Sequence, residues 1–87
     1  MQPIQDAIVY LIDDDASVRE ALAWLLRSRR LTSDSFASAD QFLAMLERGF
    51  VPTQPCCLLL DVRMPGTSGL ALFEQLAARG LVEVMPV

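Results

Sequence analysis

The chain has 87 residues and a formal net charge of −4, and 53% of its residues are apolar. This length allows one domain, and the apolar content excludes an intrinsically disordered chain. The sequence contains no histidine, which excludes histidine-based acid–base chemistry and histidine zinc ligands, and its acidic balance makes nucleic acid a poor partner for the surface as a whole.

No apolar run is long enough to cross a membrane, and the N-terminus has no basic stretch followed by an apolar one. We therefore expect neither a membrane span nor a signal peptide. The only two cysteines, Cys56 and Cys57, are adjacent and cannot build a disulfide framework. A cytoplasmic location fits this cysteine usage best.

The first predicted elements are a strand and a helix. Residues 7–12 form a continuous apolar run, which is typical of a strand that is covered on both faces. Residues 16–30 predict a helix, because their apolar positions repeat with helical spacing. Either Asp15 or Ser17 can cap its start, and Ser17 and Glu20 are spaced as a capping box. The apolar face of this helix consists of Val18, Ala21, Leu22, Leu25 and Leu26.

The middle of the chain repeats this alternation. Residues 31–37 predict a short strand near a sheet edge, and residues 38–41 open a second helix with another capping box. Gly49 is a plausible stop for that helix. Residues 56–60 are a second continuous apolar run and predict a third strand. The apolar face of the second helix consists of Phe42, Leu43 and Leu46.

The last third of the chain predicts a turn, a helix and the approach to a further strand. Turn-forming residues occupy positions 64–69, a third helix is expected from about residue 69 to residue 79, and residues 82–87 lead toward another strand. Alternating strands and helices predict an α/β fold with a mostly parallel sheet and right-handed crossovers. The residues that the third helix is expected to bury are Leu70, Phe73, Leu76 and Ala77.

Carboxylates follow both strongly apolar strands. Asp13 and Asp14 come directly after the first strand, and Asp61 follows the third. Ligands bind at the carboxyl ends of parallel strands, so these side chains converge if the two strands are neighbours. A hard divalent cation would relieve the repulsion between three such groups, and carboxylates with retained waters describe a magnesium site. Asp15 is instead expected to be a helix cap, and Asp61 taken alone is equally consistent with a turn.

The order of these motifs resembles the receiver domain of two-component response regulators. The string at residues 35–43 is also similar to receivers that precede helix-turn-helix output domains. The resemblance implies a flavodoxin-like, doubly wound parallel sheet. It rests on residues at separate points of the chain, in order: Asp13, Asp14, Asp61, Met64, Pro65, Gly66 and Gly69.

The resemblance also implies a role for each site residue. Asp61 matches the aspartate that accepts a phosphoryl group from a partner histidine kinase. Asp14 matches the direct ligand of Mg²⁺ (or Mn²⁺), and Asp13 matches the neighbour that reaches the metal through water. Arg63 matches the position that offers its main-chain carbonyl to the metal. A member of this family is a signalling protein rather than an enzyme, and it reaches DNA only through an attached output domain.

The family has five βα units, whereas this sequence holds three. The family's Ser or Thr after the fourth strand finds no match, because residue 87 falls just before its expected position. Its Lys after the fifth strand finds none either, because the chain contains no lysine. We therefore expect residues 1–87 to be a receiver domain that is incomplete at its C-terminus, without the fourth and fifth units. The third strand would then be a bare edge, which predicts a homodimer or a domain-swapped oligomer.

Two alternatives stay open at this point. Asp13 and Asp15 are similar to the nucleophile motif of haloacid-dehalogenase-like Mg²⁺ phosphohydrolases, with Asp13 as nucleophile and Asp15 as acid and base. That hypothesis leaves Asp61 and the turn after it unexplained. The other alternative is a non-phosphorylated dimerisation module with a vestigial acidic site, which predicts no magnesium-dependent change in the fluorescence of Trp24.

Overall fold

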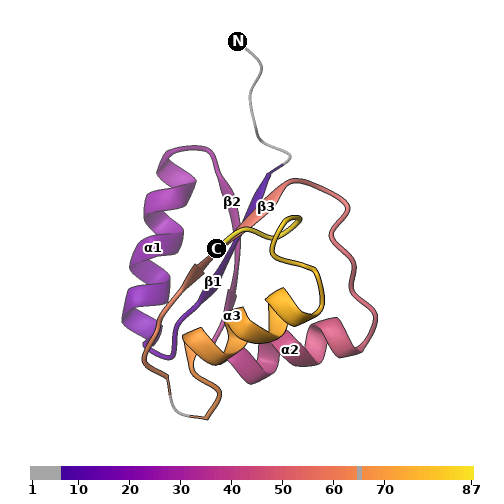
Figure 1. The fold of residues 1–87 in the computed structure, drawn as a ribbon. Helices are drawn as coiled ribbons and strands as arrows, with labels where there is room; N and C mark the ends of the chain where they lie inside the picture. Colours follow the sequence, from indigo (N-terminus) through magenta and orange to yellow (C-terminus); the bar gives the residue numbers. More distant parts are fainter. Residues whose placement is uncertain (1–6, 65) are drawn as a thin grey trace.

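One parallel sheet with helices on both faces makes up the fold. The computed structural model describes residues 7–64 and 66–87. The strands lie in the order β2-β1-β3, with α1 on one face of the sheet and α2 and α3 on the other (Figure 1). This confirms the predicted α/β fold, including the short edge strand. The elements in chain order are β1 (Ile8–Ile12), α1 (Ala16–Ser28), β2 (Thr32–Phe36), α2 (Ala39–Glu47), β3 (Cys56–Leu60) and α3 (Gly69–Ala78).

The main hydrophobic core lies between the sheet and the pair α2 and α3. Successive strand residues point to opposite faces of a sheet, so Tyr10 and Ile12 of β1 and Leu58 of β3 enter this core together. Tyr10 packs against three phenylalanine rings, with centroid separations between 5.6 and 6.1 Å. The alternate residues Val9 and Leu11 are buried on the α1 face. The apolar β1 run is therefore explained by burial on both faces.

The expected apolar face of α1 is much less buried than the spacing predicted. No residue of α1 is buried, and Val18 and Leu25 are 39% and 53% exposed. Trp24 is 65% exposed. The reason is that α1 contacts the sheet below it but has no other described element beside it, whereas α2 and α3 also pack on each other.

The buried face of α3 also differs from the prediction. Leu76 is buried as expected, but Leu70 is 60% exposed and Leu72 takes its place in the core. Phe73 is 37% exposed. Because α3 is apolar almost all round, helical spacing does not single out one face. Its rotation is set instead by the close packing of Gly69 against the chain after β3.

The helix starts follow the capping rules with two changes of detail. Asp15 is the N-cap of α1 and accepts hydrogen bonds from the N–H groups of Ser17 and Val18, so Ser17 lies inside the helix and the box with Glu20 does not form. Ser38 caps α2 through the N–H of Gln41. The Gln41 side chain reaches back one residue further than a standard capping box and accepts from the Ala37 N–H at 3.0 Å.

The C-terminal residues do not form a strand, but they do lie along β3. The N–H of Leu58 donates to the Pro86 carbonyl at 2.8 Å, and Met85 is fully buried in the main core. The expectation of a bare β3 edge is therefore wrong for its first half, which the chain's own residues cover. No helix in the described part of the chain has the length and apolarity needed to span a membrane.

Candidate functional site

Hydrogen bonds of the sheet position the acidic residues that follow β1 and β3. The N–H of Asp13 donates to the Phe36 carbonyl at 3.2 Å, and the N–H of Asp61 donates to the Ile12 carbonyl at 3.0 Å. Ile12 and Leu60 are register partners, so the residues that follow them leave the sheet side by side. The two strand ends are thus fixed by main-chain contacts and not by their side chains.

The structure brings three of the predicted carboxylates together. One carboxylate oxygen from each of Asp13, Asp14 and Asp61 lies within 4.8 Å of the other two. Asp13 and Asp61 are half-buried, whereas Asp14 is exposed and leaves the cluster open to solvent. An all-oxygen donor set of this kind fits a hard cation such as Mg²⁺ or Mn²⁺.

No arginine among the described residues forms an ion pair with a carboxylate of this cluster. Within residues 7–64 and 66–87 the one ion pair joins Arg79 to Glu47, between α3 and the end of α2. Three carboxylates at such short separation repel one another, so an external cation would gain from all three. The charge of the site therefore favours a divalent metal on physical grounds alone.

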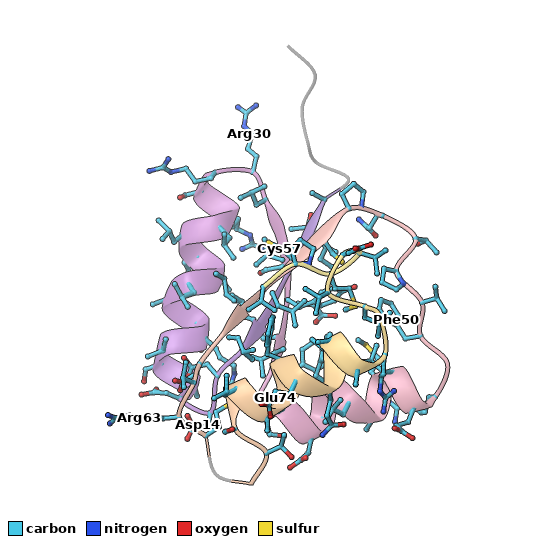
Figure 2. The ribbon with its side chains drawn as sticks, viewed as in Figure 1. Asp14, Arg30, Phe50, Cys57, Arg63 and Glu74 are labelled. Atoms are coloured by element: carbon cyan, nitrogen blue, oxygen red, sulfur yellow. The ribbon has the colours of Figure 1, made fainter. Side chains whose placement is uncertain are left out.

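Main-chain donors orient two of the three carboxylates. Asp13 Oδ1 accepts from the N–H of Asp15 at 2.9 Å, and Asp61 Oδ1 accepts from the N–H of Arg63 at 3.1 Å. Each carboxylate thus closes a short Asx-type turn, which leaves its second oxygen for another ligand. The Arg63 side chain is exposed and extends away from the body of the molecule (Figure 2).

Arg19 makes a contact that no pattern in the sequence indicates. Its Nη1 atom donates to the main-chain carbonyl of Asp13 at 2.6 Å, so the first turn of α1 holds the end of β1 in place. Arg19 follows Asp13 by six residues, a spacing that belongs to no known motif, so the sequence does not indicate this contact. The contact depends on the path of the chain between β1 and α1.

Gly69 packs directly against the main chain of Asp61. A Cβ atom at position 69 would lie 2.1 Å from the Asp61 carbonyl oxygen, a distance that no side chain tolerates. The N–H of Gly69 also donates to the Val62 carbonyl at 3.2 Å. The start of α3 is therefore fixed against the residue that ends β3. Pro65, which was expected to shape this loop with Gly66, lies outside the described residues.

A second contact that holds the loop before α3 in place is likewise not indicated by any sequence pattern. The Thr67 hydroxyl donates to Asp40 Oδ1 at 2.6 Å, which links the loop before α3 to the first turn of α2. Gly66, at φ +75°, lies close to the same carboxylate. The residues involved are far apart in sequence, so only the fold brings them together.

Asp15 stands apart from the cluster. Its Oδ1 atom caps α1, as the cap preference of aspartate predicts, and it is not among the three clustered carboxylates. A phosphohydrolase of the haloacid-dehalogenase type would pair Asp13 with Asp15. The arrangement observed pairs Asp13 and Asp14 with Asp61 instead.

Comparisons with known proteins agree with this arrangement. The family model described as "Response regulator receiver domain" matches residues 9–87. The transcriptional regulatory protein FixJ of Azorhizobium caulinodans is 50% identical over 72 residues, which cover 83% of this chain and 32% of FixJ. The response regulator protein TodT of Pseudomonas putida is 42% identical over 81 residues, which cover 93% of this chain and 33% of TodT.

The solved structure of the response regulator StyR matches with a TM-score of 0.78 and 42% sequence identity, covering 92% of this chain and 38% of StyR. The chain thus spans about a third of the length of the relatives FixJ and TodT. The family model covers nearly the whole chain, and the relatives that match it are response regulators or transcriptional regulators by name. The chain belongs to the response regulator receiver domain family.

Proposed function

We propose that this chain accepts a phosphoryl group on Asp61 from a partner histidine kinase. The observation that carries the proposal is the cluster of Asp13, Asp14 and Asp61, with one oxygen of each within 4.8 Å of the others. Asp61 uses one oxygen to accept from the Arg63 N–H. Its second oxygen accepts no hydrogen bond from the described residues and is the atom proposed to attack phosphorus.

The transfer is an in-line displacement at phosphorus. The Asp61 oxygen forms a bond to phosphorus, the bond between phosphorus and the kinase imidazole breaks, and that nitrogen keeps the electron pair. A bound Mg²⁺ or Mn²⁺ would supply neutralisation of charge on the phosphoryl oxygens. Asp14 and Asp61 are the proposed direct ligands, Asp13 acts through water, and Arg63 offers its main-chain carbonyl.

The output of the signal is proposed to be transcription. FixJ is a transcriptional regulatory protein by name, and this chain matches about a third of it, so the DNA-binding part is assigned to a domain outside residues 1–87. The net charge of −4 supports this assignment, because the chain itself offers no broad basic surface for DNA. The receiver is thus proposed to control its output and not to contact DNA.

A small phosphodonor tests the proposal. The chain is incubated with acetyl phosphate and Mg²⁺, with or without a metal chelator added beforehand, and the intact mass is then measured. We expect the mass to increase by one phosphoryl group with Mg²⁺, and not to increase when the chelator is added first or when Asp61 is replaced in Asp61→Asn. Asp15→Asn is the matched control, since asparagine also caps helices and Asp15 lies outside the cluster.

Each alternative predicts a different result. A phosphohydrolase with Asp13 as nucleophile would still be phosphorylated in the Asp61→Asn variant and would lose the phosphoryl group with Asp13→Asn. A dimerisation module with a vestigial site would gain no mass and would show no magnesium-dependent change in Trp24 fluorescence. Either result would overturn the assignment of Asp61 as the phosphoryl acceptor.

A further inference from the structure

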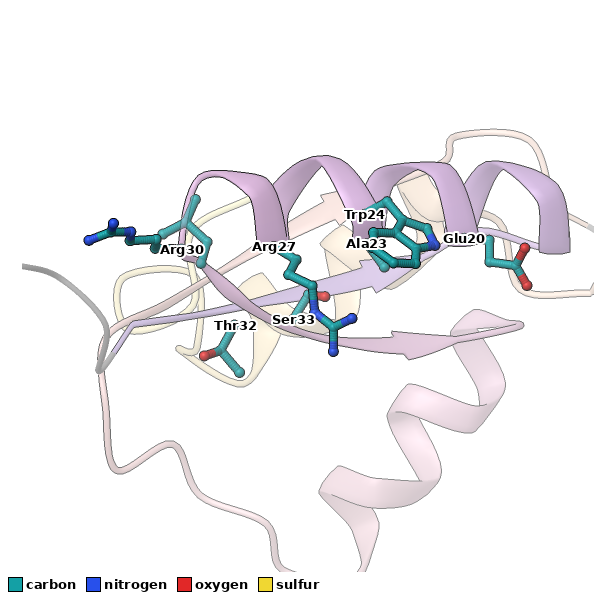
Figure 3. A pocket seen from close by; sticks show the side chains of 8 residues that line it. Glu20, Ala23, Trp24, Arg27, Arg30, Thr32 and Ser33 are labelled. Carbon is teal, nitrogen blue, oxygen red and sulfur yellow. The ribbon is translucent and has the colours of Figure 1, made fainter.

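A groove runs between α1 and the outer edge of β2, away from the carboxylate cluster. It has a volume of about 610 Å³ (Figure 3). Arg27 extends from α1 to the level of β2 beside Ser33, with Trp24 next to it, while Arg30 and Glu20 lie at the two ends. Figure 2 shows Arg30 at the opposite end of the molecule from Asp14. The groove is therefore separate from the proposed phosphorylation site.

The main chain of β2 offers one open hydrogen-bonding position in this groove. The Phe36 carbonyl accepts from the Asp13 N–H, so the alternation of a strand turns the N–H and C=O of Ser33 away from β1. The next outward N–H, that of Ser35, already donates to Asp34 Oδ1 at 3.1 Å. An unpaired strand edge is a template for an added strand, and here Asp34 limits that template to the stretch around Ser33.

The side chains of the groove add positive charge and an aromatic surface. Arg27 and Arg30 form no ion pair within the described residues, where the one such pair joins Arg79 to Glu47. The Arg27 guanidinium carbon lies 5.3 Å from the centroid of the Trp24 ring, and this ring is 65% exposed. A chain of net charge −4 therefore presents a local cationic site with an open aromatic face.

Arg30 occupies a backbone conformation that favours glycine. Its φ is +62°, just after the end of α1, where a glycine usually ends a helix. A side chain in this conformation costs stability relative to glycine. Arg30 thus places a positive charge at the end of the groove, at a position where glycine would make the folded chain more stable.

We propose that this groove binds an extended acidic peptide segment of a partner protein. The peptide main chain pairs with the N–H and C=O of Ser33. One carboxylate of the peptide contacts Arg27 in the middle of the groove, another lies near Arg30 at its end, and a neighbouring apolar side chain packs on Trp24. Glu20 at the opposite end repels carboxylates, so the acidic residues of the peptide are directed toward Arg27 and Arg30. This binding is independent of phosphorylation at Asp61.

The single tryptophan of the chain makes the test direct. Trp24 lies in the groove, so its emission reports occupancy. The probe is a seven-residue peptide of alternating glutamate and valine with blocked ends, titrated into the whole chain. We expect a saturable change in emission, and an affinity lowered roughly tenfold by Arg27→Gln, because hydrogen bonds between charged groups are strong. Arg48→Gln, an exposed arginine outside the groove, is expected to leave the affinity unchanged.

Arg30→Gly separates binding from folding. Glycine relieves the positive φ, so this variant is expected to unfold at a higher temperature than the unchanged chain and yet to bind the peptide more weakly. A loss of binding caused by a damaged fold would be accompanied by lower stability. Unchanged affinity in both Arg27→Gln and Arg30→Gly would overturn the proposal.

Two further probes test the main-chain contact and the charge. Ser33→Pro removes an outward N–H without touching the ladder to β1, and a peptide that is N-methylated on alternate residues tests the same contact without altering the protein. Both are expected to weaken binding. If the N-methylated peptide binds as well as its parent, or a peptide of lysine and valine binds as well as the acidic one, the proposal is wrong.

Discussion

The Thr67 hydroxyl donates a hydrogen bond to Asp40 Oδ1 at 2.6 Å, so the loop that leads away from the acidic cluster is fastened to the first turn of α2. The bond joins the loop before α3 to α2 outside the hydrophobic core. Because Thr67 is half-buried and Asp40 is exposed, water competes for the carboxylate but less for the hydroxyl. This contact is the direct route from the Asp61 loop to α2.

Loss of this hydrogen bond is expected to weaken the fold modestly. Thr67→Val removes the hydroxyl and keeps the side-chain shape, so we expect the free energy of unfolding to fall by about 1 kcal/mol in a urea titration. Thr53→Val, at an exposed position between α2 and β3, is the matched control and should change stability little. Equal effects of the two variants would show that the bond with Asp40 contributes nothing measurable.

The metal ligands are expected to differ sharply in their response to substitution. Asp14→Ala should lower the affinity for Mn²⁺ by more than roughly tenfold. A tenfold loss is typical when a residue that only orients a metal ligand is removed, and Asp14 is a proposed direct ligand. Arg63→Ala should leave the affinity nearly unchanged, because the proposed ligand at that position is the main-chain carbonyl. Calorimetric titration of Mn²⁺ into each variant measures both effects. A large loss with Arg63→Ala would rule out the carbonyl assignment.

Gly69 is expected to tolerate no side chain. Gly69→Ala would place a Cβ atom 2.1 Å from the Asp61 carbonyl oxygen, so the start of α3 or the end of β3 must shift. We expect a loss of about 1–3 kcal/mol in unfolding free energy, which is typical of overpacking, together with slower phosphorylation by acetyl phosphate. Gln75→Ala, on the exposed surface of the same helix, is the control for helix propensity. Wild-type rates in the Gly69→Ala variant would contradict this account.

Alkaline pH is expected to destabilise the chain through two buried groups. Burial raises the pKa of the Cys56 thiol, and the negative charge of the adjacent Cys57 raises it further. Burial also raises the pKa of the Tyr10 hydroxyl, and the negative charges of Cys56 and Asp34 add to that shift. A pKa raised on folding favours the protonated native state, so this stability is present at neutral pH and is lost as pH rises above about 8.5, where an unfolded thiol ionises.

Thermal unfolding as a function of pH measures this effect. Cys56→Ala should flatten the loss of stability between neutral and alkaline pH, although packing loss lowers its stability at every pH. Cys57→Ala keeps the buried thiol at position 56 and removes only the smaller cause of its raised pKa, so it should retain most of the slope. If both variants lose stability with rising pH as steeply as the unchanged chain does, ionisation of Cys56 does not cause the loss of stability at alkaline pH.

Association of this chain with itself is expected at micromolar concentration. Apolar side chains on α1 and on β3 are exposed, among them Leu25 at 53% and Leu59 at 43%, and the β3 edge beyond Leu58 has no strand beside it. We expect a homodimer or a domain-swapped oligomer in sedimentation velocity experiments. A single monomeric boundary, with cooperative thermal unfolding, would show that the chain's own C-terminal residues protect the edge sufficiently.

The sheet and the meeting of the three carboxylates were predictable from the sequence for a shared physical reason. Strands that are buried on both faces read as continuous apolar runs, as residues 8–12 and 56–60 do. Once two such strands are neighbours and parallel, the residues that follow them must meet at one edge. The convergence of Asp13, Asp14 and Asp61 therefore required only the strand order and no knowledge of side-chain packing.

The sequence did not predict features that depend on how a helix is rotated about its axis or on contacts between residues far apart in the chain. Leu70 and Leu72 have the same hydropathy, so the buried face of α3 was decided by a steric contact at Gly69 and not by periodicity. The bond between Asp40 and Thr67 joins residues 27 positions apart, and no local pattern encodes it. The coverage of β3 by Pro86 likewise depends on how the chain turns after α3.

The uneven burial of the helices has a consequence for local opening. Because α1 buries none of its own residues whereas α2 buries four, α1 can detach from the sheet at smaller cost than α2 can, and that cost lies mainly in exposing Val9 and Leu11. The amide hydrogens of α1 should therefore exchange with solvent through local unfolding, whereas those of β1 and α2 should exchange only when the whole domain unfolds. The chain that runs from Asp15 to Ser28 would then behave as a separate cooperative unit, hinged at the very residues that begin the acidic cluster.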